Sequence, residues 1–81
     1  MKIRYFAWIK EITNKEFDII NKNYPKSINE LKTYLNKSYP ALEKHFNDNI
    51  LRFAINTEYS STNKKLDPTD EIAIFPPVSG G

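Results

Sequence analysis

The feature that most constrains this chain is a short apolar run that stops at two consecutive prolines. The run, residues 72–75, has the length and composition of a buried β-strand. Pro76 and Pro77 lack the backbone N–H that a neighbouring strand would need, and each holds φ near the polyproline value. We therefore expect the sheet to end here and the C-terminal tail, residues 76–81, to continue as a stiff extended arm.

The tail finishes on residues that contribute little to a fold. Val78 and Ser79 are followed by Gly80 and Gly81, and glycine has the most freedom to lose on ordering and no side chain to pack. The advantage of a segment without Cβ atoms is its small cross-section. It can enter a narrow site of another protein and present a terminal carboxylate there. The alternative is an ordinary disordered end, against which the two prolines and the Gly-Gly ending argue.

The N-terminal part of the sequence alternates with the period of a strand. Residues 2–9 predict one strand that carries Phe6 and Trp8 on the same face. Residues 10–15 are polar and turn-prone, and residues 16–20 form a second strand-like run. We expect a hairpin of two strands with residues 10–15 as its connection.

One long helix is predicted in the middle of the chain. Ser27 and Glu30 have the Ser-x-x-Glu spacing of a capping box, and Pro40 prevents an unbroken continuation. We expect a helix over residues 28–37 and one further short turn over residues 40–46. The apolar residues that these two segments turn inward are Ile28, Leu31, Leu35, Leu42 and Phe46.

The remaining elements are short. Residues 51–56 alternate like a third strand, residues 56–59 resemble a turn into a short edge strand, and Leu66 is a candidate core residue. Residues 67–70, Asp-Pro-Thr-Asp, predict a turn before the last strand. The element order predicts one α+β domain over residues 1–81, a mixed sheet of about five strands with one main helix on one face.

The last strand predicts an apolar patch on the side of the sheet that faces away from the helix. If Ile72 and Ile74 point toward the helix, their neighbours point the opposite way. The residues expected on this outer face are Phe6, Trp8, Ala54, Ala73 and Phe75. Exposed aromatic residues in an apolar patch are typical of a protein interface; the alternative is that a loop or the tail covers the patch.

The composition argues against self-sufficient catalysis. The chain has no cysteine, so disulfides, thiolate metal sites and a cysteine nucleophile are excluded. His45 is the single histidine and lacks a nucleophile at a recognisable spacing. The two glycines are the terminal pair, so a glycine-rich phosphate loop is also missing. We expect no metal site in this domain.

Charge and hydropathy argue against nucleic-acid and membrane partners. The net charge is +2 and the charges of both signs are interspersed, which is a weak footprint for nucleic acid. No apolar run approaches the roughly 20 residues that span a bilayer, and the N-terminus lacks the apolar core of a signal peptide. We therefore expect a cytoplasmic protein.

Two stretches of the sequence resemble a known family. They are residues 70–81, Asp-Glu-Ile-Ala-Ile-Phe-Pro-Pro-Val-Ser-Gly-Gly, and the early residues Phe6-Ala7 and Lys10-Glu11-Ile12. Both are similar to the MoaD-like sulfur carriers, the small subunits of molybdopterin synthase, in the MoaD/ThiS family. The resemblance implies a ubiquitin-like β-grasp fold, with the first and last strands as parallel neighbours at the centre of the sheet.

The resemblance also implies a function in molybdenum cofactor biosynthesis. An adenylating E1-like enzyme would use ATP to activate the carboxylate of Gly81, and a sulfur donor would convert it to a thiocarboxylate. The large synthase subunit would then accept the tail, and the sulfur would pass to a cyclic pterin precursor to form the molybdopterin dithiolene. The residues that would insert are Pro76, Pro77, Val78, Ser79 and Gly80. The resemblance implies no cofactor bound to this chain.

The implied partners are the large subunit, in a heterotetramer of two small and two large subunits, the activating enzyme and the sulfur donor. Phe6 and Phe75 match family positions that pack against the large subunit, and Trp8 is a third expected contact from its place on the same face. Two other functions remain open at this point. One is a thiamine-pathway carrier or another ubiquitin-like sulfur carrier or modifier. The other is a plain interaction domain that makes no use of its terminus.

Overall fold

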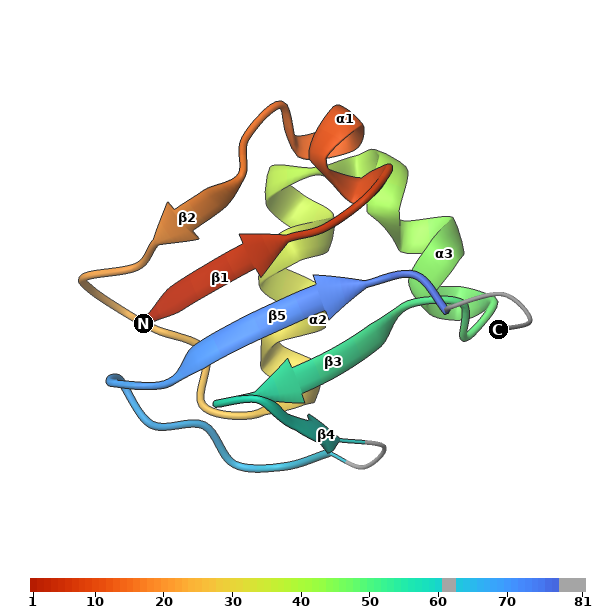
Figure 1. Cartoon of the computed structure of the whole chain (residues 1–81). Helices are drawn as coiled ribbons and strands as arrows, with labels where there is room; N and C mark the ends of the chain where they lie inside the picture. Colours follow the sequence, from red (N-terminus) through yellow and green to blue (C-terminus); the bar gives the residue numbers. More distant parts are fainter. Residues whose placement is uncertain (61–62, 78–81) are drawn as a thin grey trace.

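The computed structural model describes residues 1–60 and 63–77, which form a five-stranded mixed sheet with helices on one face (Figure 1). The strand order across the sheet is β2-β1-β5-β3-β4. The strands are β1 Lys2–Tyr5, β2 Phe17–Ile19, β3 Arg52–Ile55, β4 Glu58–Ser60 and β5 Glu71–Phe75. The helices are α1 Ile9–Thr13, α2 Ile28–Ser38, the 3₁₀ turn η1 Pro40–Leu42 and α3 Glu43–Asn47.

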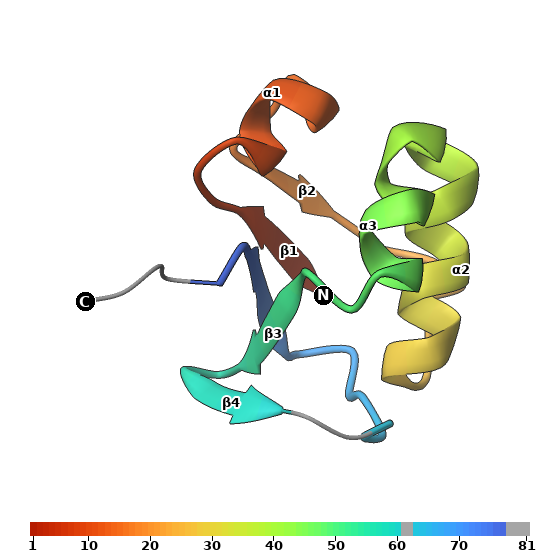
Figure 2. The same cartoon turned by 90° about the vertical axis from the view of Figure 1, so that its right-hand side faces the viewer.

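The centre of the sheet is a parallel pair formed by the first and last strands. β1 runs beside β5 with Ile3 opposite Ile72 and Tyr5 opposite Ile74, and the other neighbouring strands are antiparallel. This is the arrangement that the family resemblance implies, so the β-grasp prediction is confirmed. Turned by 90°, the molecule shows α2 and α3 on one side of the sheet and no helix on the opposite side among the described residues (Figure 2).

The long helix begins where the sequence predicts. Ser27 has an extended backbone, and its side-chain oxygen accepts a hydrogen bond of 3.2 Å from the backbone N–H of Glu30, which satisfies one of the free donors of the first turn. Ile28, Leu31 and Leu35 of α2 are buried. They pack in one core with the inward residues of the central strands.

The second helical segment closes the core at one end of α2. Leu42 is fully buried, and the ring of Phe46 stacks on Phe53 of β3 with centroids 5.7 Å apart. Leu66 joins the same core with 7% of its surface exposed. The predictions of a short turn after Pro40 and of Leu66 as a core residue are both confirmed.

The predicted first strand is too long. β1 ends at Tyr5, Ala7 has φ of 54°, and the chain then forms the short helix α1. The predictions of a strand through Ile9 and of a plain turn over residues 10–15 are therefore wrong. A helix of five residues shows too little of its 3.6-residue period to break an apparent alternation.

The turn before β5 is fixed by its own side chains. The carboxylate of Asp67 accepts hydrogen bonds from the backbone N–H of Thr69 at 3.0 Å and from its hydroxyl at 2.7 Å, and these bonds lower the pKa of Asp67 below its usual value. Asn56, in the turn between β3 and β4, accepts from the backbone N–H of Glu71 at 3.0 Å. These contacts set the starting point of β5.

Candidate apolar docking face and tail

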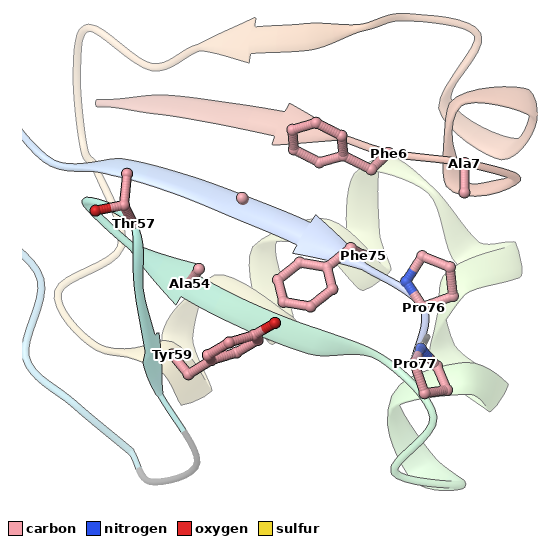
Figure 3. A pocket seen from close by; sticks show the side chains of 9 residues that line it. Phe6, Ala7, Ala54, Thr57, Tyr59, Phe75, Pro76 and Pro77 are labelled. Carbon is pink, nitrogen blue, oxygen red and sulfur yellow. The ribbon is translucent and has the colours of Figure 1, made fainter. Parts of the chain in front are cut away.

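The face of the sheet opposite the helices carries an apolar hollow of about 680 Å³ (Figure 3). Its floor is made of small side chains, because Ala54 of β3 lies directly opposite Ala73 of β5. Its walls are larger residues contributed by β4, β5, the turn between β3 and β4, and the segments that follow β1 and β5. The residues that line the hollow are Phe6, Ala7, Ala54, Thr57, Tyr59, Ala73, Phe75, Pro76 and Pro77. We call this surface the outer hollow.

Three aromatic rings stand around the floor of the outer hollow. The rings of Phe75 and Tyr59 meet edge to face with centroids 5.5 Å apart. Tyr59 is 78% exposed and Phe6 is 40% exposed, which is a large apolar exposure for a small domain. The prediction that Phe6, Ala54, Ala73 and Phe75 share one outer patch is confirmed.

Tyr59 belongs to this surface and was missed by the sequence reasoning. It lies in the edge strand β4 directly opposite Ala54, and paired residues of neighbouring strands project to the same face. The outer position of Tyr59 could therefore have been inferred from the sequence, because a turn at residues 56–59 into an antiparallel strand pairs Tyr59 with Ala54.

The start of the tail lies on the same surface. β5 is paired on both sides up to its end, since Phe6 donates its backbone N–H to the carbonyl of Ile74 at 3.1 Å and Arg52 lies opposite Phe75. Pro76 and Pro77 follow at once, border the outer hollow, and have no N–H with which to continue the ladder. The apolar surface and the exit of the tail are thus one continuous site.

The last four predicted tail residues, Val78, Ser79, Gly80 and Gly81, lie outside the described residues. The predictions that they insert into a partner and that Gly81 carries the reacting carboxylate therefore stay predictions.

A left-handed residue shapes the rim of the outer hollow. Ala7 has φ of 54°, a conformation that costs a residue with a Cβ roughly 1–2 kcal/mol. This bend ends β1 and turns the chain toward α1, while the ring of Phe6 stays over the outer face (Figure 3). Backbone strain of this kind is common where a surface serves binding.

Trp8 lies elsewhere, contrary to the prediction. It stands in the turn before α1, is half-buried, and packs its ring 4.7 Å from that of His45 in α3. It does not line the outer hollow. The bend at Ala7 is the physical reason, because it breaks the alternation that would have carried Trp8 to the side of Phe6.

The charged residues beside the outer hollow are mainly cationic. By alternation with buried neighbours, Lys2, Arg4 and Arg52 project from the outer face, with Glu71 as the acid among them. Arg4 approaches Glu71 at 3.4 Å and lies 5.5 Å from the ring centroid of Phe6. A partner that covers this face would meet an apolar centre and a basic border.

A polar cluster ties β2 to the core on the opposite face. Asp18 accepts hydrogen bonds from the hydroxyls of Tyr5 at 2.7 Å and Tyr39 at 2.5 Å, and from Lys15 at 3.0 Å. Burial would raise the pKa of Asp18, but these bonds and the charge of Lys15 lower it below its usual value. Burial first, then the bond to Asp18, raises the pKa of Tyr5. The cluster is structural, since these groups are bonded to one another rather than open to a ligand.

Within residues 1–60 and 63–77, no three His, Cys, Asp or Glu side chains are grouped so as to hold a metal ion. In the same described part of the chain, none of the helices has the length and apolar character that crossing a bilayer requires.

Comparisons with known proteins agree with this geometry. The molybdopterin synthase sulfur carrier subunit of Dictyostelium discoideum is 37% identical over 83 residues, which cover 99% of this chain and 94% of that protein. Among solved structures, a putative molybdopterin converting factor, subunit 1, from Pyrococcus furiosus has a TM-score of 0.80 at 22% identity and covers 95% of both chains. SAMP1 from Haloferax volcanii has a TM-score of 0.78 at 24% identity and covers 99% of this chain and 97% of its own. The two structures show the fold alone. The model of the ThiS family matches residues 3–81, and the chain therefore belongs to the ThiS family.

Proposed function

We propose that this protein is the sulfur carrier subunit of a molybdopterin synthase and that Gly81 carries the sulfur. The observation that carries the proposal is the continuity of the outer hollow with the start of the tail at Pro76 and Pro77. A partner that binds the hollow would receive the chain at a fixed point, Pro76 and Pro77, whose rings restrict φ. The sulfur carrier subunit that is 37% identical over nearly the whole chain supports the same reading.

The partner on the outer hollow is the large subunit of the synthase. Phe6, Tyr59 and Phe75 provide the aromatic contacts, and interfaces commonly gain most of their binding energy from a few such residues. The basic border favours a partner surface with carboxylates around an apolar centre. The assembly would be a heterotetramer of two small and two large subunits.

The chemistry begins with activation, because a free carboxylate repels nucleophiles and has no leaving group. The activating enzyme transfers AMP from ATP to the Gly81 carboxylate, and pyrophosphate leaves. A persulfide sulfur attacks the acyl carbon, AMP leaves, and cleavage of the sulfur–sulfur bond by a thiol releases the thiocarboxylate. ATP is consumed by the partner enzyme and is not a cofactor of this chain.

Transfer then takes place in the large subunit, where the terminal sulfur forms a carbon–sulfur bond with the cyclic pterin precursor in place of one of its carbon–oxygen bonds. Water then cleaves the bond between this sulfur and the Gly81 acyl carbon, which leaves the sulfur on the pterin and returns the terminus to a carboxylate. The dithiolene contains two sulfurs, so two loaded carriers are needed for each product. This chain contributes the reacting atom and its position, and positioning alone is worth a large part of a rate enhancement. The cytoplasmic location expected from the sequence stays a prediction.

The test follows sulfur on the terminus by intact mass. Wild type, a variant lacking Gly81 and a variant with one extra residue are incubated with the activating enzyme, ATP and a persulfide donor. Deletion or extension moves the reacting carbon by roughly 3.3–3.6 Å, the reach of one residue. We expect the wild type alone to gain the mass difference of sulfur for oxygen, on its C-terminal fragment.

Two other outcomes are informative. Equal loading of all three chains would refute the carrier mechanism. Formation of a covalent conjugate between the wild-type terminus and lysines of other proteins, with no terminal sulfur, would indicate a ubiquitin-like modifier instead. Circular dichroism spectra should coincide for the three chains, because the tail lies beyond the last sheet residue, Phe75.

A further inference from the structure

The strand at the opposite side of the sheet from β4 has an open edge. β2 is paired with β1 alone. Tyr5 donates its backbone N–H to Glu16 and Ile20 donates to Met1, each at 2.9 Å. In an antiparallel ladder alternate residues bond to the partner strand, so Asp18 also points its backbone groups toward β1. Phe17 and Ile19 therefore direct their N–H and C=O groups away from the sheet (β2 in Figure 1).

The side chains of these same two residues are exposed on the outer face. Phe17 lies opposite Arg4 and Ile19 lies opposite Lys2, so both project to the side away from the helices. Phe17 is 46% exposed and Ile19 is 52% exposed. Neither residue lines the outer hollow, so this is a second apolar surface. We call Phe17, Ile19 and the open edge between them the β2 edge.

A cation lies over the β2 edge. The ammonium of Lys2 is 4.5 Å from the ring centroid of Phe17, so the charge of this β1 residue lies against an exposed side chain of β2. Within the described part of the chain, Arg4 pairs with Glu71 and Lys15 pairs with Asp18, but no ion pair involves Lys2. Its charge is thus available to a carboxylate brought in from outside.

We propose that the β2 edge binds an extended segment of another protein, which adds to the sheet as a sixth strand. The main-chain groups of Phe17 and Ile19 would form the new ladder, and apolar side chains of the segment would cover the two exposed side chains. A carboxylate on the same face of the segment, one strand from β2, would reach the ammonium of Lys2. The partner segment is therefore an alternation of β-branched residues with a flanking Asp or Glu.

A second copy of this chain fits the edge less well. In an antiparallel pairing of two β2 edges, both Lys2 ammoniums would project from the same face. Lys2 belongs to β1, however, so both β2 strands would lie between the two ammoniums, and the outer face of the second β2 would offer Phe17 and Ile19 but no carboxylate. A second copy therefore leaves Lys2 without an acidic partner, and the charge pattern favours an acidic segment over self-association.

The proposal can be tested on the folded protein with a synthetic probe. The capped peptide Thr-Glu-Thr-Val-Thr-Val-Thr-Glu-Thr places both valines and both glutamates on one strand face in either direction. It is titrated against the ¹⁵N-labelled protein by nuclear magnetic resonance. We expect amide shifts centred on Phe17 and Ile19, and none centred on residues 58–60 of the other edge strand.

The contribution of the Lys2 charge is tested separately from that of the main-chain groups of the β2 edge. The same peptide with lysine in place of glutamate, and the variant Lys2→Gln, should each weaken binding by up to about fivefold, the upper range for an exposed ion pair. The matched control is Lys64→Gln, an exposed lysine elsewhere, and it should bind as the wild type does. Ile19→Pro removes one outward N–H and should abolish binding.

Three results would overturn the proposal. They are shifts centred on β4 or the outer hollow, equal affinity for the acidic and basic peptides, and the absence of any shift. Concentration-dependent dimerisation in sedimentation, lost in Ile19→Pro, would show that a second copy occupies the edge instead. If Ile19→Pro fails to fold, the two peptides and Lys2→Gln still decide the question.

Discussion

Replacing Phe75 by aspartate separates binding at the outer hollow from folding. Ile72 and Ile74 of β5 are fully buried and hold the strand in the core. Phe75 is half-buried on the opposite face, where its ring contacts Tyr59 at a centroid distance of 5.5 Å. An aspartate at position 75 would project from the same outer face, with Arg52 directly opposite on β3. Phe75→Asp should therefore fold.

The loss of affinity for the large subunit should be large. Truncating an aromatic side chain at the centre of an interface commonly costs about 2–4 kcal/mol of binding free energy. This loss corresponds to an increase in Kd of roughly 30- to 1,000-fold. The new carboxylate adds to this loss, because in the free domain it can pair with the exposed Arg52, whereas in the complex both groups are desolvated. We expect a loss at the upper end of this range or beyond.

The assay is titration calorimetry with the large subunit, with circular dichroism as the check on folding. Phe17→Asp is the control, because Phe17 is an aromatic residue on the same face, is more exposed than Phe75, and lies outside the outer hollow. It should keep the wild-type Kd for the large subunit. Unfolding of Phe75→Asp would mean that Phe75 belongs to the core. Wild-type affinity in a folded Phe75→Asp would refute the outer hollow as the docking surface.

Three further predictions concern the stability of the fold, each measured by urea denaturation. Ser27→Ala removes the acceptor of the Glu30 N–H and should cost about 1 kcal/mol; an unchanged midpoint would contradict the helix start. Ala7→Gly should stabilise by about 0.5 kcal/mol, because glycine relieves the left-handed strain at φ of 54° and offsets part of that gain with its own entropy. Asp18→Asn should destabilise by about 2 kcal/mol at neutral pH, since the hydroxyls of the buried Tyr5 and the half-buried Tyr39 lose a charged acceptor. The pKa of Asp18 is lowered by folding, so its contribution is full above the unfolded pKa and is lost as the pH falls through the folded pKa. The difference between wild type and Asp18→Asn should thus shrink in acid, and a difference independent of pH would contradict this origin.

Elements with a complete local signal could be predicted from the sequence. α2 has a cap at Ser27 and buried residues at helical spacing, and β5 is an apolar run closed by two prolines. Alternation along β5 assigned Ile72 and Ile74 to the side that faces the helix and Phe75 to the opposite side. The burial of both isoleucines agrees with this assignment. The adjacency of β1 and β5 came from the family resemblance, because no local pattern fixes which distant strands pair.

The position of Trp8 could not be predicted in the same way. It depends on a left-handed residue, Ala7, and alanine carries no sequence preference for that conformation. Once the chain bends there, Trp8 reaches His45 in α3, a contact across 37 positions of sequence that alternation cannot reveal. The open edge of β2 was equally hidden, since it follows from the register with β1 and not from the residues of β2 alone.

One face of the sheet carries the core that stabilises the fold, and the other face carries the exposed apolar residues. The two prolines separate the sheet from the tail. The side chains fully buried on the central strands, Ile3, Ile72 and Ile74, all point toward the helices, so their burial does not depend on what covers the outer face. The exposed rings of Phe6 and Tyr59 contribute little to the stability of the isolated domain and would be buried in the proposed complex. Pro76 and Pro77 follow the last strand residue, Phe75, so substitutions beyond them remove no hydrogen bond of the described sheet. Defects in folding, docking and sulfur loading should accordingly arise from substitutions at three different sets of residues, and each set can be assayed while the other two remain intact.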